Sequence, residues 1–214
     1  MSFRKNGYQV VENVLDDKIL KHLSTEFEMT KDVFFYMFNR NDKHTFGDKQ
    51  SPNSFSMYSP ICFEALLPNL NDIFNEISGK KLVPAASYAR IYYEGAILEK
   101  HIDRNCCEYS ATICIDSDCL WDFFIEDYEK NTNKILLNPG DLCFYKGCDL
   151  THWRHPYTGK KQIQCFLHYV DSEGEYKDWI FDQRPLLGLN KKQVFLEMFR
   201  LLHQDDDITT IMSF

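Results

Sequence analysis

Residues 97–116 read ILEKHIDRNCCEYSATICID and contain two short apolar or alternating runs, 97–103 and 109–116, joined by a polar turn. Similar runs separated by turn residues occur on both sides, at 86–93, 120–126, 133–137, 141–145 and 161–170. Closely spaced short runs of this kind predict strands of a sandwich or jelly roll. We therefore expect a β core over about residues 83–171.

A first strand and a helix are expected before this core. Residues 7–14 alternate weakly, as a strand does. Apolar residues then recur every four positions over 15–27, which predicts a helix with Asp16 or Asp17 at its N-terminal cap. The polar and aromatic segment 34–58 predicts a long loop.

Further helices are expected next to the core and at the C-terminus. Residues 63–77 carry a helical pattern that is interrupted or restarted at Pro68 and stops at Gly79. Residues 191–203 predict a last amphipathic helix. The prediction is an α+β chain with a mostly β core, a double-stranded β-helix or jelly roll. It forms one domain, 1–214, with helical support over about 1–80, the core over about 83–171, and a C-terminal segment and helix over 172–214.

Composition excludes some classes of partner. Hydrophobic residues make up 44% of the 214 residues, which is enough for a buried core. The 24 basic and 32 acidic residues give a net charge of −8, which argues against nucleic acid as the main partner. No apolar run reaches the roughly 18 residues that a membrane span requires, so no membrane partner is expected.

The eight cysteines predict reduced thiols rather than a disulfide framework. The opening residues, MSFRKNGYQV, lack the apolar region of a secretory signal. No C-x-x-C pair occurs, which argues against a structural zinc site of the usual spacing. We therefore expect a cytoplasmic protein.

The triplet His101-Ile102-Asp103 predicts metal chemistry. A strand directs alternate side chains to one face, so His101 and Asp103 are expected to point the same way. One distant histidine would complete a set of two imidazoles and one carboxylate. Such a set caps one side of an octahedral metal and leaves the opposite positions open. Two histidines, His152 and His155, are candidates for the third ligand.

Lys161 predicts an anion nearby. It lies on the apolar face of the alternating run 161–170, where an ammonium group is costly unless an anion meets it. The alternative is a lysine at the strand edge that extends to water. Tyr92 is a candidate hydroxyl donor to the same anion or, alternatively, a plain core aromatic. Ser110 and Thr112 are candidate polar residues of the pocket.

Taken in order, these residues resemble the Fe(II)- and 2-oxoglutarate-dependent oxygenases, in the prolyl-4-hydroxylase-like branch and especially its small bacterial and phage members. The resemblance covers about residues 86–171. It is carried by the tyrosine, the glycine and the His-x-Asp triplet of one half, and by the histidine, proline, glycine and basic residue of the other: Tyr92, Gly95, His101, Asp103, His152, Pro156, Gly159 and Lys161.

The resemblance implies a function and a set of roles. His101, Asp103 and His152 would bind iron, and the same order favours His152 over His155. Lys161 and Tyr92 would bind the far carboxylate of 2-oxoglutarate, with Ser110 as a further residue of that pocket. The implied reaction uses O₂, hydroxylates a C–H bond and releases succinate and CO₂. A prolyl residue in a peptide or protein is the leading substrate, and free amino acids or another small molecule remain open. Ascorbate is admitted as an additional cofactor.

Two other classes of protein remain open. Jelly rolls also serve as non-catalytic cupin-like modules that bind a metal or a ligand, and as structural proteins of phages, because a fold does not determine a function. Neither class requires a carboxylate clamp next to a metal. The arrangement of the basic residue and the histidines in space therefore discriminates between them.

Overall fold

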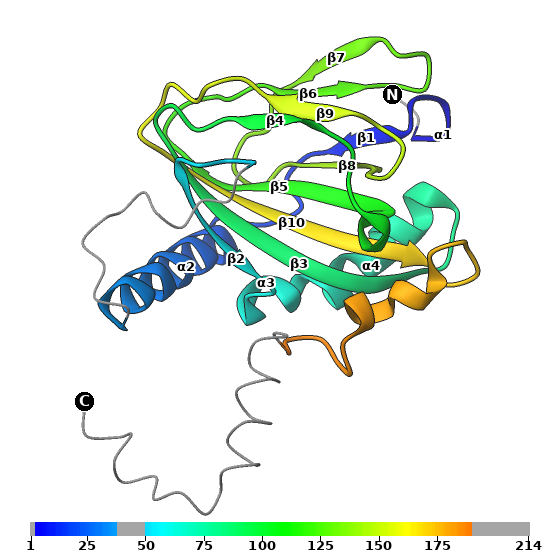
Figure 1. The fold of residues 1–214 in the computed structure, drawn as a ribbon, viewed down its shortest axis with the longest axis horizontal. Helices are drawn as coiled ribbons and strands as arrows, with labels where there is room; N and C mark the ends of the chain where they lie inside the picture. The colour runs from blue at the N-terminus through cyan, green and yellow to red at the C-terminus, as the bar shows by residue number, and fades with distance from the viewer. Residues whose placement is uncertain (1–2, 38–49, 190–214) are drawn as a thin grey trace, which may run out of the picture.

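Two antiparallel sheets face each other in the computed structural model, which describes residues 3–37 and 50–189 (Figure 1). The larger sheet has the order β1-β8-β5-β10-β3-β2 and the smaller one the order β4-β9-β6-β7. This arrangement confirms the predicted jelly roll. The strands of the larger sheet are β1 (Tyr8–Val11), β8 (Leu142–Lys146), β5 (Tyr109–Ser117), β10 (Lys161–Asp171), β3 (Leu82–Tyr93) and β2 (Ser54–Tyr58). Those of the smaller sheet are β4 (Leu98–His101), β9 (His152–Arg154), β6 (Phe123–Glu126) and β7 (Thr132–Ile135).

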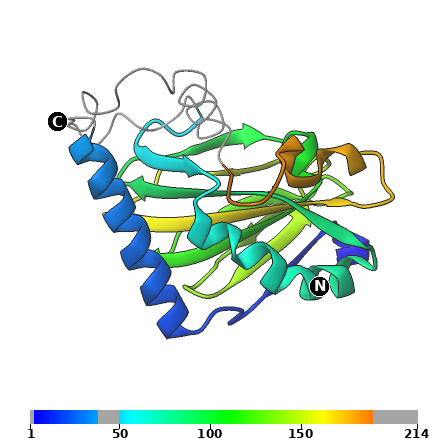
Figure 2. The same ribbon diagram turned by 90° about the horizontal axis from the view of Figure 1, so that it is seen from below.

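The helices cover the outer face of the larger sheet (Figures 1 and 2). They are α1 (Phe3–Asn6), α2 (Asp17–Met37), α3 (Ile61–Glu64) and α4 (Leu66–Ser78), and two short 3₁₀ segments follow, η1 (Asn105–Cys107) and η2 (Lys177–Gln183). The Asp16 carboxylate accepts hydrogen bonds from the backbone of Lys18 and Ile19, so Asp16 is the cap of α2. Gly79 ends α4 with a left-handed φ of 68°, as predicted.

The segment predicted as a loop over 34–58 differs from the prediction at both ends. Helix α2 continues to Met37, and Ser54–Tyr58 forms strand β2. The physical reason is aromatic packing, because the rings of Phe34 and Phe35 each lie 5.9 Å from the ring of Phe55. The predicted helix over 191–203 lies outside the described residues.

The larger sheet has two buried faces of different chemistry. Its outer face meets the helices and is apolar; on β10 it carries Ile163, Cys165, Leu167 and Tyr169. The opposite face, toward the smaller sheet, is mixed, and it carries the buried polar residues of these strands: Gln162, Gln164 and His168 on β10, and Ser110 and Thr112 on β5. Buried polar side chains must have their hydrogen bonds satisfied inside the protein, which makes this part of the inner face the place to look for a site.

A buried ion pair holds the segment after β10 against the sheet. Arg184 and Glu64 are 2.8 Å apart, and their side chains are only 1% and 2% exposed. Arg184 also donates to the Ser59 hydroxyl and to the Ala85 carbonyl. Among the residues that the structure describes, no helix has the length and apolar character needed to span a bilayer.

Candidate metal centre

Two histidines face each other across neighbouring strands. His101 ends β4 and is the register partner of His152, which begins β9. Their ring centroids are 4.3 Å apart. Asp103 lies just beyond the end of β4, where its backbone N–H donates to the carbonyl of Gly147 at 2.9 Å. The polypeptide therefore places all three predicted ligands at one end of the smaller sheet.

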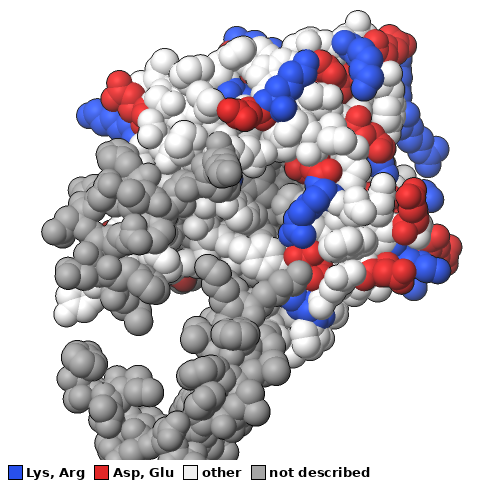
Figure 3. Space-filling view, viewed as in Figure 1, with Lys and Arg blue, Asp and Glu red and all other residues white. Residues whose placement is uncertain are grey.

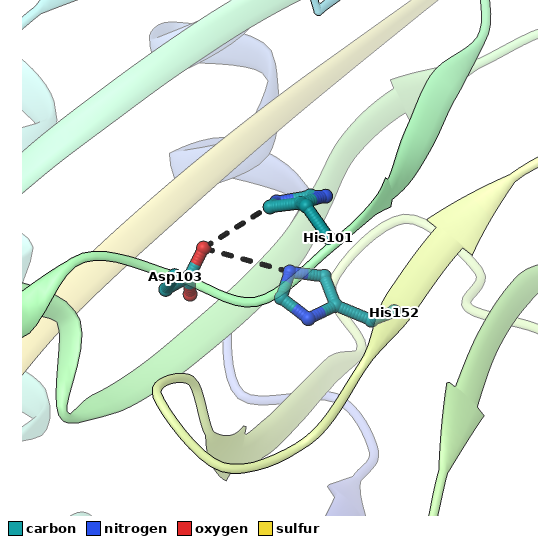
Figure 4. Close-up of side chains that lie close together, drawn as sticks. All are labelled: His101, Asp103 and His152. Atoms are coloured by element: carbon teal, nitrogen blue, oxygen red, sulfur yellow. Dashed lines mark ion pairs between the residues drawn. The ribbon is translucent and has the colours of Figure 1, made fainter.

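The three side chains converge on one point (Figure 4). Asp103 Oδ1 lies 3.5 Å from Nε2 of His101 and 3.6 Å from Nε2 of His152. Atoms that each lie about 2.1 Å from one ion are roughly 3–4 Å apart, so this geometry fits a shared metal ion. The predicted convergence of His101, Asp103 and His152 is found in the structure. His155, the alternative, is exposed on the outside of the smaller sheet, with its ring against Phe124.

Backbone carbonyls select the tautomer of both histidines. Nδ1 of His101 lies 2.7 Å from the carbonyl of Glu99, and Nδ1 of His152 lies 2.9 Å from that of Leu150. A carbonyl only accepts hydrogen bonds, so each Nδ1 must carry the proton. In the neutral rings both Nε2 lone pairs then point at the Asp103 carboxylate. Three electron-pair donors that face one another attract a cation between them, which is how the ligands of a metal site are arranged.

The pKa values of Asp103 and His101 are shifted by the same arrangement of side chains. Burial raises the pKa of Asp103, but the nearby His152 and hydrogen bonds to both imidazoles lower it far below its ordinary range. Burial lowers the pKa of His101, but its hydrogen bonds to Asp103 and to the Glu99 carbonyl outweigh burial, and the net pKa is raised. The site thus favours an ionised carboxylate beside positive charge.

A cavity of about 300 Å³ opens onto the three side chains. Beyond the triad, its wall includes Tyr58, Tyr88, Arg90, Tyr92, Tyr145 and His168. Arg104 also lines it, and because the Arg104 side chain is 53% exposed we place the mouth there. On the face of the molecule that Figure 3 shows, basic and acidic side chains lie next to one another. Both carboxylate oxygens of Asp182 bind the Arg104 guanidinium, and one of them accepts from the Tyr58 hydroxyl.

The structure places Tyr92 in the cavity wall and Ser110 beside the metal ligands. The Tyr92 ring is buried against Trp121, with the ring centroids 4.8 Å apart. Ser110 Oγ lies 2.9 Å from Asp103 Oδ2 and 2.9 Å from Nδ1 of His168. Thr112, another predicted pocket residue, accepts a hydrogen bond from Gln164. Ser110 therefore contacts a metal ligand directly.

Lys161 is not where the sequence argument placed it. Its ammonium group pairs with Asp116 at 3.0 Å and with Glu28 of helix α2, and it is not part of the cavity wall. The reason is the alternation of β10. Lys161 shares the apolar face that packs on the helices, whereas the buried polar residues lie on the face directed at the metal centre. Lys161 therefore forms ion pairs at the start of β10, on the helix side of the sheet, and does not extend to water as the alternative had it.

A different cation, Arg154, lies inside the barrel. It follows His152 by two positions on β9 and therefore points to the same side. Its residue is only 2% exposed, its guanidinium lies over the Trp121 ring at 4.8 Å, and Nη1 donates to the Trp121 carbonyl at 2.7 Å. Its other donors, Nε and Nη2, are buried without a hydrogen-bond partner.

The surroundings of Arg154 make it a candidate group for binding an anion. Burial lowers the pKa of its guanidinium, and the ionisable groups that oppose this shift are tyrosines and cysteines, Tyr92 foremost. Within the described residues no carboxylate pairs with Arg154. Tyr92 and Tyr145 adjoin both Arg154 and the cavity, so a ligand that extends inward from the metal would approach the unpaired donors. The His-x-Arg alternation at 152–154 was the available signal, but a three-residue strand with a polar sequence was not predicted.

The sequence matches no protein-family model and none of the curated proteins compared. The fold of this chain is nevertheless similar to those of several solved structures. A prolyl-4-hydroxylase from Pseudomonas putida aligns with a TM-score of 0.61 and 10% identity, over 79% of this chain and 95% of that one. HygX from Streptomyces hygroscopicus, solved with nickel, 2-oxoglutarate and hygromycin B, aligns with a TM-score of 0.61 and 12% identity, over 80% and 85%. SnoK, an alpha-ketoglutarate-dependent carbocyclase of nogalamycin biosynthesis, aligns with a TM-score of 0.64 and 11% identity, over 79% and 81%. These likenesses support the double-stranded β-helix fold.

Proposed function

We propose that this chain is an Fe(II)- and 2-oxoglutarate-dependent oxygenase that hydroxylates a C–H bond. The observation that carries the proposal is the pairing of two features in one barrel. Three electron-pair donors surround one point, and a buried arginine with two unpaired donors lies on the same side of the same strand. A metal and a ligand with an anionic far end satisfy both features together.

The residues fit the group that the proposal requires. His101, Asp103 and His152 would hold Fe(II) by one face, and Arg154 would bind the far carboxylate of 2-oxoglutarate in the role first assigned to Lys161. When bound, iron with 2-oxoglutarate and O₂ supplies the oxidation of a C–H bond, with release of succinate and CO₂. The protein's own work is to keep both imidazoles in the Nδ1–H tautomer and to enclose the co-substrate between aromatic walls.

The substrate is proposed to bind at the mouth of the cavity. There Tyr58, Tyr88 and Phe166 provide flat apolar surface and Arg104 provides charge held by Asp182. A prolyl residue of a peptide is one substrate that we propose to test, and a small molecule is the other. HygX was solved with hygromycin B bound and SnoK is described as a carbocyclase, and both likenesses support the test of a small molecule beside a prolyl residue.

The two alternative functions do not account for the burial of Arg154. A cupin-like module that binds only a metal, or a structural phage protein, has no need for a buried guanidinium whose donors lack partners. Such a group costs about 1–3 kcal/mol for each unsatisfied donor. Its retention beside a metal-ligand set favours the enzyme.

The test is 2-oxoglutarate consumption in air. Purified protein with Fe(II), 2-oxoglutarate and ascorbate is expected to form succinate slowly without substrate and faster with a productive proline peptide or small molecule. His152→Ala, which removes one ligand, should form none, while His155→Ala should behave as the parent because its ring lies outside the barrel. No succinate above the His152→Ala background, with or without the substrate panel, would refute the proposal.

A further inference from the structure

The two oxygens of Asp103 have different tasks. Oδ1 faces Nε2 of both histidines, as described above. Oδ2 points the other way and lies 2.9 Å from the Ser110 hydroxyl. Gly147 packs against it so closely that a Cβ on that residue would lie 2.5 Å from Oδ2 and 2.6 Å from Ser110 Oγ. Ser110 and Gly147 therefore fix the orientation of the Asp103 carboxylate from the side of Oδ2.

The neighbours of the Ser110 hydroxyl determine which groups donate and which accept its hydrogen bonds. Its hydroxyl oxygen lies within reach of Asp103 Oδ2 at 2.9 Å, the Cys107 carbonyl at 3.2 Å and His168 Nδ1 at 2.9 Å. The hydroxyl has one hydrogen, and the carboxylate and the carbonyl can only accept. If Ser110 donated to His168, its lone pairs would face an anionic oxygen at 2.9 Å. The favourable arrangement is that Ser110 donates to Asp103 and His168 Nδ1–H donates to Ser110.

We propose that Ser110 and His168 are positioning residues that form a relay to the metal-ligating carboxylate, from His168 Nδ1–H to Ser110 Oγ–H to Asp103 Oδ2. The relay directs Oδ1 at the metal and withholds Oδ2 from it. It also leaves Nε2 of His168, which lines the cavity, as an unprotonated hydrogen-bond acceptor. The inference rests on the metal site of the proposed function. It does not depend on binding of 2-oxoglutarate or on oxygenase activity.

A competing role for His168 is direct ligation. Asp103, Cys107 and His168 also offer ligand atoms within 4.8 Å of one another. In the structure, however, Nδ1 of His168 is engaged by Ser110, and the Cys107 thiol lies 3.4 Å from that of Cys106. The relay and direct ligation predict different proton positions and different responses to mutation.

The first test is the tautomer of His168 in parent protein labelled with ¹⁵N-histidine and loaded with Zn(II), which is diamagnetic. The expected spectrum has His168 protonated at Nδ1 and unprotonated at Nε2, with its signals identified by their loss in His168→Asn. In Ser110→Ala the proton is expected to move to Nε2, because the acceptor at Nδ1 is gone. Ser87→Ala, which removes another buried serine of the cavity wall, should leave the tautomer unchanged. A parent His168 protonated at Nε2 would overturn the proposal, whatever the variants do.

The second test is Co(II) affinity by calorimetry, without 2-oxoglutarate. Loss of a group that orients a metal ligand weakens binding by about 10- to 100-fold, and this is expected for Ser110→Ala. His168→Phe should weaken binding by no more than Ser110→Ala, and the double variant no more than Ser110→Ala alone, since residues that act as a unit are not additive. If His168→Phe abolishes Co(II) binding while Ser110→Ala binds normally, His168 is a ligand and the relay is wrong. Because neither test involves 2-oxoglutarate, the relay can hold even if the oxygenase activity is absent.

Discussion

Replacement of Arg154 by methionine separates binding of the co-substrate from stability. The change removes a buried cation of which one donor binds the Trp121 carbonyl and two donors, Nε and Nη2, bind nothing in the described residues. Each unsatisfied buried donor costs about 1–3 kcal/mol, and the lost hydrogen bond is worth a similar amount. The free energy of unfolding of Arg154→Met, without ligands, is therefore expected to lie within about 1 kcal/mol of the parent value or above it.

Whereas the stability of Arg154→Met is expected to be unchanged or higher, its affinity for 2-oxoglutarate should fall. A hydrogen bond to a charged group contributes about 1.5–3 kcal/mol, so loss of the guanidinium should weaken 2-oxoglutarate binding roughly 10- to 150-fold. Calorimetry with the Mn(II)-loaded protein measures this directly. An analogue, 2-oxopentanoate, has a methyl group in place of the far carboxylate. Parent protein should prefer 2-oxoglutarate over the analogue, and Arg154→Met should lose that preference.

Lys161→Met is the matched control. Lys161 forms part-exposed ion pairs with Glu28 and Asp116 on the helix side of the sheet, and such pairs are worth about 0–1 kcal/mol. Its loss should leave 2-oxoglutarate affinity within about twofold of the parent. If Lys161→Met loses the co-substrate and Arg154→Met keeps it, the assignment of the anion site to the interior of the barrel is refuted.

Other perturbations test the site and the fold. Divalent metal at about 100 times its Kd should stabilise the parent by about 2.7 kcal/mol, seen as a rise in Tm of roughly 5–10 °C, and His101→Ala should abolish that rise; an equal rise in the variant would contradict the assigned ligands. Burial lowers the pKa of His168 from 6.5 to about 4, so this histidine stabilises the fold above pH 6.5 and its contribution is lost as the pH falls toward 4. In chelator-treated protein the loss should be on the order of 3 kcal/mol and absent from His168→Phe, and identical pH profiles of unfolding would refute it. Glu64→Ala leaves Arg184 buried without its partner and should lower the free energy of unfolding by about 3–5 kcal/mol in urea; an unchanged midpoint would contradict the role of that pair.

The sequence predicted the β core and the shared direction of His101 and Asp103 because both follow from local alternation. Runs such as 109–116 and 161–170 alternate cleanly, and the structure has strands β5 and β10 there. The His-x-Asp triplet needed only the end of a strand to bring two ligands together. The third ligand came from the order of residues in the resemblance, and the structure places His152 opposite His101.

The location of Lys161 differs from the prediction because alternation gives parity but not direction. The apolar face of β10 was taken as the lining of the site, and Lys161 with it. In a jelly roll whose large sheet is covered by helices, both faces are buried, and the apolar one belongs to the helices. The polar residues of the strand, His168 among them, were the better markers of the site. Strand β9, with only three residues, gave no periodic signal, so Arg154 went unnoticed.

Anaerobic absorption spectroscopy tests the central claim most directly. Fe(II) and 2-oxoglutarate added to the parent protein without oxygen should give a visible charge-transfer band, since iron held by one face leaves positions at which the keto acid chelates. The band should be absent from His152→Ala and should require higher 2-oxoglutarate concentrations in Arg154→Met. A colourless mixture with the folded parent protein, at saturating Fe(II) and 2-oxoglutarate, would contradict the account.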